Sequence, residues 1–376
     1  MERKTNKTIG IVTINDYTNY GNRLQNFALT TLFRNYGFQV VNGIEVYTKE
    51  DWINRTESLT KKLIKKIIPF HFVRPKVDCS NNCVNHSLRR RENNFKRFNK
   101  TYTKTIDPIV VKKNTDVVKL FEQMGIDYFV VGSDQVWNPF FGGYLYEFLT
   151  FAPKEKRFSF AASIGTDKIP EEKKSYYKKC LSEMNYISVR ENKAAEIVKD
   201  LTGRDVDVVL DPTLLLPKEQ WVEIVSKPNI EIDENYICTY FLGEIPEAVY
   251  TFAKKKNLKI YKLNSIEQKE LYDINPAEFL YMIKNAEYVL TDSFHAVVFS
   301  IIFNKDFYVF ERKQVGVANM FSRIETITQR FNLQSRIQNR EVIKEEKTIT
   351  NWFEIERDLQ NERKQTFTKL LDAMGI

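Results

Sequence analysis

The sequence is short of cysteine and of long apolar runs. Four cysteines in 376 residues are too few for the disulfide framework of a small secreted protein. No apolar run reaches the ~20 residues that cross a membrane, and the first ten residues lack the apolar core of a signal peptide. We therefore expect a cytoplasmic protein that keeps its thiols reduced.

A large excess of one charge is also absent. Lys and Arg together number 57 and Asp and Glu 49, so the net charge is only +8. The sequence has no arginine-rich tract and no aromatic RNA-binding signature, and we expect no nucleic-acid partner. The modest positive charge suits an anionic small molecule or an anionic membrane surface.

Metal-binding patterns are weak. Cys79, Cys83 and His86 lie close together, but they supply only three ligands at an unusual spacing for zinc. No acidic cluster follows a predicted strand in the manner of a divalent-metal site. We therefore expect no bound metal.

Strands and helices alternate along most of the chain. A strand at Thr8–Ile14 is followed by a helix at Arg23–Tyr36 and a second strand at Phe38–Val46, and a further series begins with a strand at Tyr236–Leu242. Such alternation predicts an α/β fold with parallel sheets. At this length we expect two Rossmann-like domains, residues 1–217 and 218–376, with a long helix at the carboxyl end and a site in the cleft between them.

A basic insertion at about residues 51–105 interrupts the first domain. Its piece LTKKLIKKIIPF, residues 59–70, alternates lysine pairs with apolar residues, which on a helix separates a cationic face from an apolar face. Such a helix can lie on an anionic lipid surface, at the inner face of the membrane. The alternative is a helix packed on its own domain with its lysines in solvent.

The stretch from residue 287 to residue 310 joins a strand, a polar turn, a helix and a second strand. Its turn, Thr291–His295, falls where the carboxyl end of a parallel strand meets the start of a helix, and anionic ligands bind at such places. His295 is therefore a candidate for chemistry on an anionic substrate. The alternative is that the turn only caps the helix and that His295 hydrogen-bonds a backbone group.

Six short segments match a known family in order, from about residue 8 to about residue 330. They are NYGNRLQN at 19–26, GSDQVWNP at 132–139, AASIG at 161–165, SVRE at 188–191, DPT at 211–213 and TDSFH at 291–295. Together they resemble the polysaccharide pyruvyl transferase family.

The resemblance implies a fold and a reaction. The fold is two Rossmann-like domains arranged as in B-type glycosyltransferases. The reaction moves the enolpyruvyl unit of phosphoenolpyruvate, a co-substrate and not a cofactor, onto two hydroxyls of a sugar, giving a pyruvate ketal. Family acceptors are precursors of surface polysaccharides such as capsule, exopolysaccharide or wall polymer, often carried on a lipid diphosphate. The motif histidine, here His295, is regarded as the catalytic acid.

The turn departs from the family pattern at two positions. Some members have arginine two residues before the histidine, where this chain has Ser293, and many have glycine after it, where this chain has Ala296. The first departure leaves the donor carboxylate without an obvious partner at that place.

Phosphoenolpyruvate is a dense anion, so its site must provide positive charge. Arg190, at a strand-to-helix turn, is our first candidate for the donor, and Arg323 is the second; each has the alternative of an ordinary ion pair. We also place Ser293 and Asp292 at the donor. The helix start lowers the pKa of His295, and we expect the bound anion and Asp292 to raise it again.

The other motif loops supply candidates for the acceptor. Asp134 can accept a proton from a sugar hydroxyl while Trp137 stacks on the sugar, or Asp134 caps a turn and Trp137 fills the core. Asn19, Tyr20 and Gly21 bring backbone close to the cleft and are further acceptor candidates.

Two rival functions remain open from the sequence. One is a glycosyltransferase of the same architecture that uses a nucleotide sugar. The other is a carbohydrate-binding or membrane-scaffold protein without catalytic activity.

Overall fold

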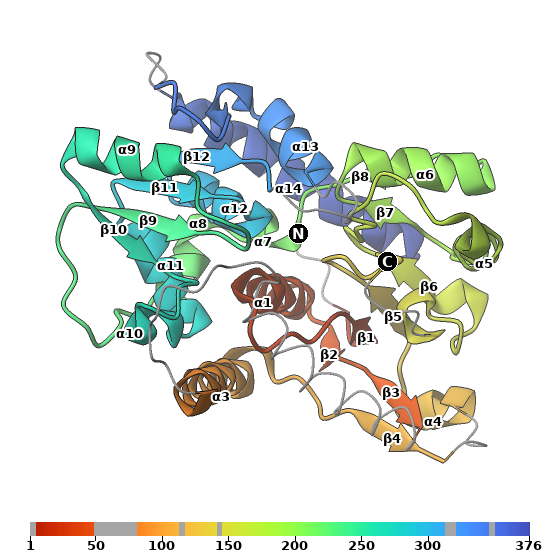
Figure 1. The fold of residues 1–376 in the computed structure, drawn as a ribbon. Coiled ribbons are helices and arrows are strands. Elements are labelled where there is room, and N and C mark those ends of the chain that lie inside the picture. The colour runs from red at the N-terminus through yellow and green to blue at the C-terminus, as the bar shows by residue number, and fades with distance from the viewer. Residues whose placement is uncertain (1–4, 49–80, 113–116, 141–144, 313–320, 346–349) are drawn as a thin grey trace.

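Two parallel β-sheets, one in each half of the chain, organise the structure (Figure 1). The computed structural model describes residues 5–48, 81–112, 117–140, 145–312, 321–345 and 350–376. The first sheet has the order β2-β1-β5-β6, and all of its neighbouring strands are parallel. Its strands are β1 (Thr8–Val12), β2 (Gln39–Asn42), β5 (Tyr128–Val131) and β6 (Arg157–Ser159).

The second sheet repeats this architecture. Its order is β10-β9-β11-β12-β13, again with parallel neighbours throughout. The predicted α/β class with parallel sheets is therefore confirmed. The strands are β9 (Tyr236–Tyr240), β10 (Lys259–Lys262), β11 (Tyr288–Thr291), β12 (Asp306–Phe310) and β13 (Ile337–Gln338).

Short parallel pairs extend the first half. β3 pairs with β4, and β7 pairs with β8, while a bridge from Ala162 to Val189 connects the β7–β8 pair to the loop after β6. The predicted strand 38–46 ends early because Gly43 adopts φ 74°, a left-handed conformation that extended strands do not contain. The pairs are β3 (Val46–Thr48) with β4 (Ile109–Val111), and β7 (Ser188–Val189) with β8 (Asp207–Val208).

Helices cover the faces of both sheets. α11 shows how the sequence sets their ends: Asn275 accepts hydrogen bonds from the amides of Ala277 and Glu278, and the Glu278 side chain accepts one from the Asn275 amide in return. The helices of the first half are α1 (Tyr20–Asn35), α3 (Asn81–Phe98), α4 (Val117–Gln123), α5 (Glu171–Ser182) and α6 (Asn192–Thr202). Those of the second are α9 (Glu247–Lys256), α10 (Lys269–Tyr272), α11 (Pro276–Lys284), α12 (Phe294–Ile302) and α13 (Ser322–Arg330).

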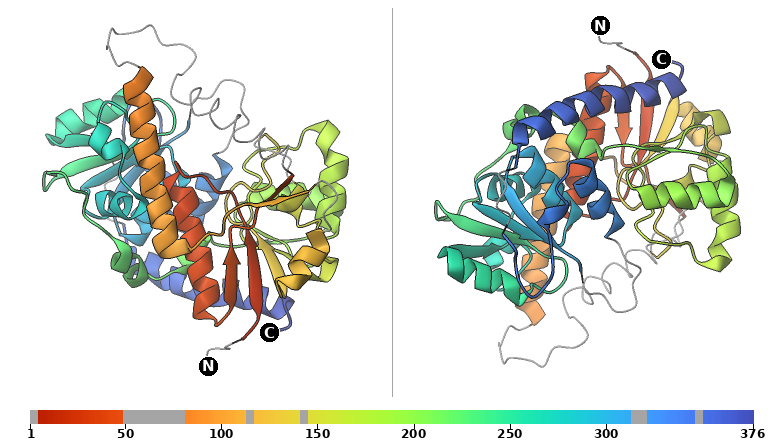
Figure 2. Two further views of the ribbon diagram at one scale, coloured as in Figure 1. Left: turned by 90° about the horizontal axis from the view of Figure 1, so that it is seen from below. Right: turned by 90° about the horizontal axis from the view of Figure 1, so that it is seen from above.

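Three further helices join the halves: α7 (Pro212–Leu215), α8 (Lys218–Ile224) and α14 (Trp352–Ala373). The domain boundary that we predict at residue 217 falls between α7 and α8. α14 runs from the second half back across the first (Figure 2). Its Phe367 ring packs against Phe33 and Phe160, and the Tyr128 hydroxyl donates to the carbonyl of Met374 just after the helix.

One apolar core continues from the first half into the second. It contains Ile9 and Leu24 of the first half together with Val297 and Phe299 of the second. Trp221 of α8 lies between them, in ring contact with Phe299. The halves are therefore held together by buried apolar surface as well as by the chain connections.

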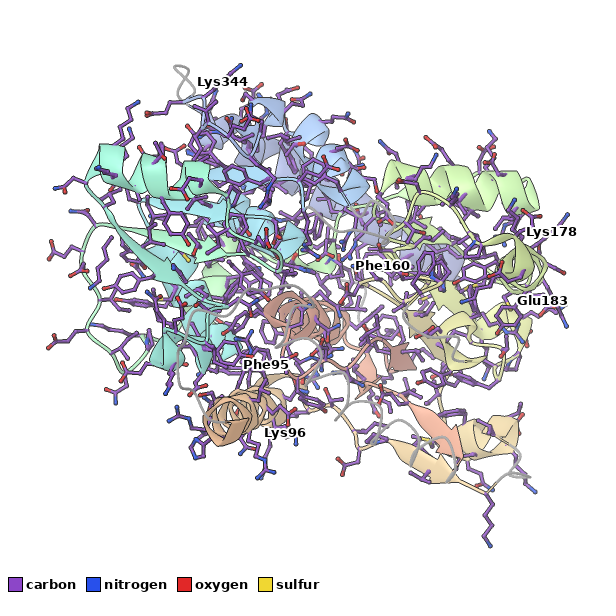
Figure 3. All side chains as sticks on the ribbon, in the orientation of Figure 1. Phe95, Lys96, Phe160, Lys178, Glu183 and Lys344 are labelled. Atoms are coloured by element: carbon purple, nitrogen blue, oxygen red, sulfur yellow. The ribbon has the colours of Figure 1, made fainter. Side chains whose placement is uncertain are left out.

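The basic insertion is described only in part. The lysine-rich piece 59–70 lies outside the described residues, so neither interpretation of it is tested. Its later part forms α3, which our sequence reading did not assign as a helix, although Leu88, Phe95 and Phe98 give it an apolar face. Figure 3 shows Phe95 on the side of α3 that faces α1, and the exposed Lys96 away from it. Within the described ranges, no helix is both long enough and apolar enough to cross a membrane.

Both sheets reverse their strand order at the motif loops. In the first sheet the reversal lies between β1 and β5, and in the second it lies between β9 and β11. Crevices at such reversals, beyond the carboxyl ends of the strands, bind ligands in open α/β sheets. The loop 132–138 follows β5 and the turn 292–295 follows β11, so each motif lies at one of these crevices.

Candidate active site

His295 lies in the first turn of α12, where the second half of the chain touches the first. Its side chain is 8% exposed. The imidazole packs directly on Gly21 at the start of α1, so closely that a Cβ atom at position 21 would lie 2.1 Å from Nδ1. Only glycine leaves room for the ring. The ring is therefore held between the two halves.

Replacing Gly21 by alanine tests this contact. We expect G21A to lower the free energy of unfolding by about 1–3 kcal/mol, because the methyl group overlaps a ring that has little space to move. Chemical denaturation measures the loss. In a H295A background the same change should cost far less, since the ring is gone; an equal cost in both backgrounds would contradict the contact.

A cluster of buried charges surrounds the imidazole. His295 Nε2 lies 3.8 Å from Oδ2 of Asp211, a residue at the start of α7. Arg190 follows β7, and Asp134 follows β5. The loops beyond the strands of the first half and the helix start of the second therefore contribute charges to a single place.

Arg190 binds two carboxylates of the first half. Its side chain is 0% exposed, and Nη1 donates to Asp211 Oδ2 at 2.7 Å while Nη2 donates to Asp134 Oδ1 at 3.2 Å. Burial works against the charged guanidinium, yet Asp211 and Asp134 outweigh it and raise the pKa of Arg190. Arg190 therefore builds the site, and most of its donors are already occupied.

Arg323, near the start of α13, differs from Arg190. It is buried, and both terminal nitrogens lie 3.1–3.2 Å from the side-chain amide of Gln135, when the oxygen of that amide faces them. Among the described residues no carboxylate lies within ion-pair distance of it. Burial, followed by repulsion from Arg190, lowers the pKa of Arg323 to about 10. Its charge is thus the least compensated in the cluster.

Several polar atoms in the cluster have no hydrogen-bond partner. Within the part of the chain that the structure describes, the unpartnered buried atoms include Arg190 Nε, Glu191 Oε2, His295 Nε2 and Arg323 Nε. Both arginines lie against the ring of Phe294, with Cζ 4.8 Å from its centroid for Arg190 and 5.7 Å for Arg323. Buried polar atoms rarely remain unsatisfied, so this cluster has the character of a binding site.

Burial controls the protonation of His295. It lowers the pKa to about 4, and Arg190 and Arg323 act in the same direction, while Asp211 and Asp134 oppose them. This agrees in direction with the expectation from the helix start, but desolvation is the main cause. In the free protein the imidazole is therefore neutral at pH 7.

This shift makes stability depend on pH. The unfolded chain protonates His295 near pH 6.5 and the folded chain only near pH 4, so the unfolded state binds more protons between these values. The contribution of His295 to stability is fully present above pH 6.5, and we expect on the order of 3 kcal/mol of it to be lost as pH falls to 4. Urea denaturation across this range should show the loss in the wild type and a flatter profile in H295Q. Identical profiles would mean that the ring is not desolvated.

Asp134 is held as a carboxylate. Asn22 Nδ2 donates to it at 2.7 Å, and it also binds Arg190. Although burial raises its pKa, Arg190, His295, Asn22 and Arg323 outweigh burial and hold the pKa well below the usual range. A carboxylate with so low a pKa is a weak base, but it is well placed to fix Arg190 and to favour a positive charge on the imidazole.

Asp292 and Ser293 take different positions around the turn. The Asp292 carboxylate accepts hydrogen bonds from the amides of Leu242 and Gly243 and pairs with Arg312 at 2.9 Å. It therefore ties the loop after β9 to the turn after β11. Ser293 is the N-cap of α12, but its hydroxyl makes no capping hydrogen bond. The amide end of α12 thus has no side-chain cap.

The aromatic candidates for acceptor binding lie inside the protein. Tyr20 is 0% exposed, stacks on Phe279 and donates its hydroxyl to the carbonyl of Ile274. Trp137 is 1% exposed, and its Nε1 donates to the carbonyl of Glu147, so it fills the core as in the alternative stated above. Asn19 caps α1 by accepting from the Asn22 amide.

Sequence reasoning left two members of the cluster out. Asp211 and Glu191 belong to matched motifs, DPT and SVRE, but were not assigned as site residues. Glu191 Oε1 accepts from the Ser163 hydroxyl and from the amides of Ile164 and Gly165, which fixes the AASIG loop. The available signal was the motif itself, because Glu191 stands next to Arg190 in SVRE and Asp211 is the first residue of DPT.

Two hollows of the described surface lie outside the charge cluster. One, of about 460 Å³, lies between α6 and α13 and is lined by Asp167, Lys193, Glu196 and Glu325 with neutral residues. Because Lys193 pairs with Glu196, the lining is acidic and does not suit an anion. The second, of about 430 Å³, lies between α8 and α14. We give the charge cluster more weight than these shallow grooves.

Metal ligands do not gather in the same way. The described part of the chain has no group of three or more His, Cys, Asp or Glu side chains with the arrangement of a metal site. The side chains of Cys79 and Cys83 lie outside the described residues, while His86 is exposed on α3.

Comparison with known proteins identifies a family. A profile described as polysaccharide pyruvyl transferase matches residues 19–314, which is well over half of the chain. No curated protein gives a significant sequence match.

Similar solved structures are distant in sequence. A UDP-GlcNAc 2-epimerase from Neisseria meningitidis, bound to UDP-GlcNAc, is 9% identical over 97% of this chain and 91% of that chain, with a TM-score of 0.45. A putative UDP-N-acetylglucosamine 2-epimerase from Listeria monocytogenes is 11% identical over 98% of this chain and 91% of that chain, with a TM-score of 0.46. The family profile, by contrast, includes every strand of the two main sheets except β1 and β13, and it includes the turn with His295. The chain therefore belongs to the polysaccharide pyruvyl transferase family, and its activity is pyruvyl transfer in polysaccharide synthesis.

Proposed function

We propose that the protein transfers the enolpyruvyl unit of phosphoenolpyruvate onto two hydroxyls of a sugar and so forms a pyruvate ketal. The acceptor is a precursor of a capsule, exopolysaccharide or wall polymer, carried on a lipid diphosphate. The observation that carries the proposal is the group of unpartnered buried atoms around His295, above all on Arg323. A compact polyanion would accept a hydrogen bond from Arg323 Nε and compensate the charge of Arg323.

The donor site follows from the separation of the two arginines' roles. Arg190 is held by Asp211 and Asp134, so it contributes positive electrostatic potential and does not offer a free pair of N–H groups to the donor. Among the described residues, the hydrogen-bond partner of the Arg323 guanidinium is one neutral amide oxygen, that of Gln135. Ser293 and the uncapped amide end of α12 add neutral donors. We place the donor carboxylate or phosphate between Arg323 and the start of α12.

His295 supplies the proton in this proposal. Protonation of C3 of phosphoenolpyruvate makes C2 electrophilic, and one sugar hydroxyl adds to C2 and loses its proton. The proton of that hydroxyl replaces the one that His295 gave to C3. The C2–O bond to phosphate then breaks, the second hydroxyl closes the ring on C2, and its proton leaves with the phosphate. The donor's negative charge raises the pKa of the nearby imidazole from about 4, so His295 becomes an acid mainly in the donor complex.

Arg323 gives a prediction for donor affinity. We expect R323M to weaken phosphoenolpyruvate binding by about 10- to 100-fold, because one charge-assisted contact is lost. Calorimetry measures the affinity directly. R330M serves as a control on the same helix, because Arg330 pairs with Glu362 instead. Unchanged affinity in R323M would remove Arg323 from the donor site.

Product formation tests the reaction. The protein is incubated with phosphoenolpyruvate and a panel of galactosides and other glycosides, free and lipid-diphosphate-linked, and phosphate release is measured with mass analysis of the sugar. We expect phosphate release matched by a pyruvylated sugar. Stabilisation by a nucleoside diphosphate, with none by phosphoenolpyruvate, would favour a glycosyltransferase instead. Release of neither product across the panel would overturn the proposal.

A further inference from the structure

Arg91 of α3 is buried at the contact between the two halves. The residue is 1% exposed. Its guanidinium lies between two aromatic rings, with Cζ 4.4 Å from the centroid of Tyr20 and 4.7 Å from that of Tyr272. A planar cation between two rings has little freedom to move.

Hydrogen bonds tie this one guanidinium to both halves. Nε and Nη2 donate to the carbonyl of Thr18, at 3.0 and 2.7 Å, in the loop that leads into α1. Nη1 donates at 2.7 Å to the carbonyl of Tyr272, at the end of α10 in the second half. The distance between these two loops is therefore fixed by the width of one side chain.

Neighbouring side chains of α3 also bind the segment that follows α10. Arg90 forms an ion pair with Asp273 at 2.5 Å, and Asn94 Nδ2 donates to the carbonyl of Asp273 at 2.5 Å. Tyr20 binds the next carbonyl, that of Ile274. Segment 272–274 is thus held at three successive residues.

The loop that Arg91 holds leads directly to His295. Thr18 precedes Tyr20 and Gly21 by only a few residues, and Gly21 packs on the imidazole. We propose that Arg91 is a positioning residue: by binding a carbonyl of each half, it fixes the start of α1 against α12 and keeps His295 enclosed. Its consequence for turnover rests on the proposed function, whereas its effect on the surroundings of His295 does not.

Lysine cannot replace Arg91 in this arrangement. An ammonium group is a single point and lacks the planar fork that reaches both carbonyls while lying between two rings. R91K therefore keeps the charge but loses the bridge. Arg89 lies on the same helix and is exposed, so R89K is the matched control.

Histidine NMR reports on the enclosure without requiring activity. The chain has three histidines, so the signal of His295 can be assigned with H71Q and H86Q. We expect R91K to raise the pKa of His295 from about 4 toward 6.5, because water reaches the ring. Asp211, Asp134, Arg190 and Arg323, the charges that face the ring, are unchanged by the substitution. R89K should titrate as the wild type does.

Hydrogen exchange and kinetics complete the test. In R91K we expect amide exchange in residues 16–22 and 272–275 to rise at least tenfold, and kcat to fall about tenfold with little change in KM for phosphoenolpyruvate. A lower Tm with wild-type exchange and wild-type titration of His295 would overturn the proposal and leave Arg91 a purely structural residue.

A second variant covers the case in which R91K does not fold. N94A removes one contact with segment 272–274 and leaves Arg91 in place. Because Arg91 still binds Thr18 in N94A, we expect exchange to rise in that segment alone and His295 to keep its pKa of about 4. A pKa of His295 that moves toward 6.5 while Arg91 is in place would overturn the proposal. If the variants change exchange and the pKa of His295 as expected, but the wild type transfers no pyruvyl unit, then the proposed function alone is contradicted.

Discussion

Replacement of His295 by glutamine is expected to lower kcat by about 10²- to 10⁴-fold, the usual contribution of a general acid. Glutamine keeps a polar group of similar size but cannot hand a proton to C3 of the donor. The fold should survive, because a neutral amide suits a site that already keeps the imidazole neutral. Initial rates of phosphate release measure the effect.

The control is His86, which is exposed on α3. H86Q should leave the rate unchanged. Since His295 is neutral in the free protein, donor binding at pH 7 must also take up a proton, which calorimetry in buffers of different ionisation enthalpy detects. A loss of less than about threefold in H295Q, or no proton uptake, would exclude His295 as the acid.

Replacement of Arg190 by methionine is expected to destabilise the protein by about 3–5 kcal/mol. The reason is that Asp211 and Asp134 would be left buried without their shared cation. Urea denaturation measures the loss. Arg323, which has no such carboxylate partner among the described residues, should show a much smaller loss when replaced, so the two arginines separate by stability as well as by donor affinity.

Two further variants make this prediction specific. R357M removes an exposed arginine of α14 that pairs with Asp358, and should cost at most about 1 kcal/mol. In R190M/D211N the unpaired buried charge of Asp211 is also removed, so the double variant should be more stable than R190M. If R190M costs no more than R357M, then water screens the cluster and its charges do not act as a buried network.

Local patterns in the sequence predicted much of the secondary structure correctly. The strand predicted at Tyr236–Leu242 begins at the same residue as β9, and the helix predicted at Arg23–Tyr36 ends within one residue of the end of α1. Both have a clear apolar period and a clear start or end signal. α3 was not predicted because most of its residues are polar or basic, and its buried apolar residues are few.

The aromatic candidates show where local patterns stop. Tyr20 and Trp137 stand in matched motifs beside residues of the site, yet both side chains lie in the core. An aromatic residue after a strand can stack on a ligand or fill the interior, and the sequence around it is the same in either case. Burial depends on elements far away in the chain, such as Phe279 for Tyr20, whose side chain completes the packing.

By itself the sequence determined the α/β class, the family and the place of His295 at the start of a helix, because these depend on residue order, period and short motifs. Only the tertiary structure decided which arginine is occupied and which is not. Arg190 donates hydrogen bonds to Asp211 and Asp134, which lie 21 and 56 residues away in the sequence. Arg323 is buried, and no described carboxylate lies within ion-pair distance of it. The interaction energy of a charged group depends on its neighbours in space and on its access to water, and local sequence patterns determine neither.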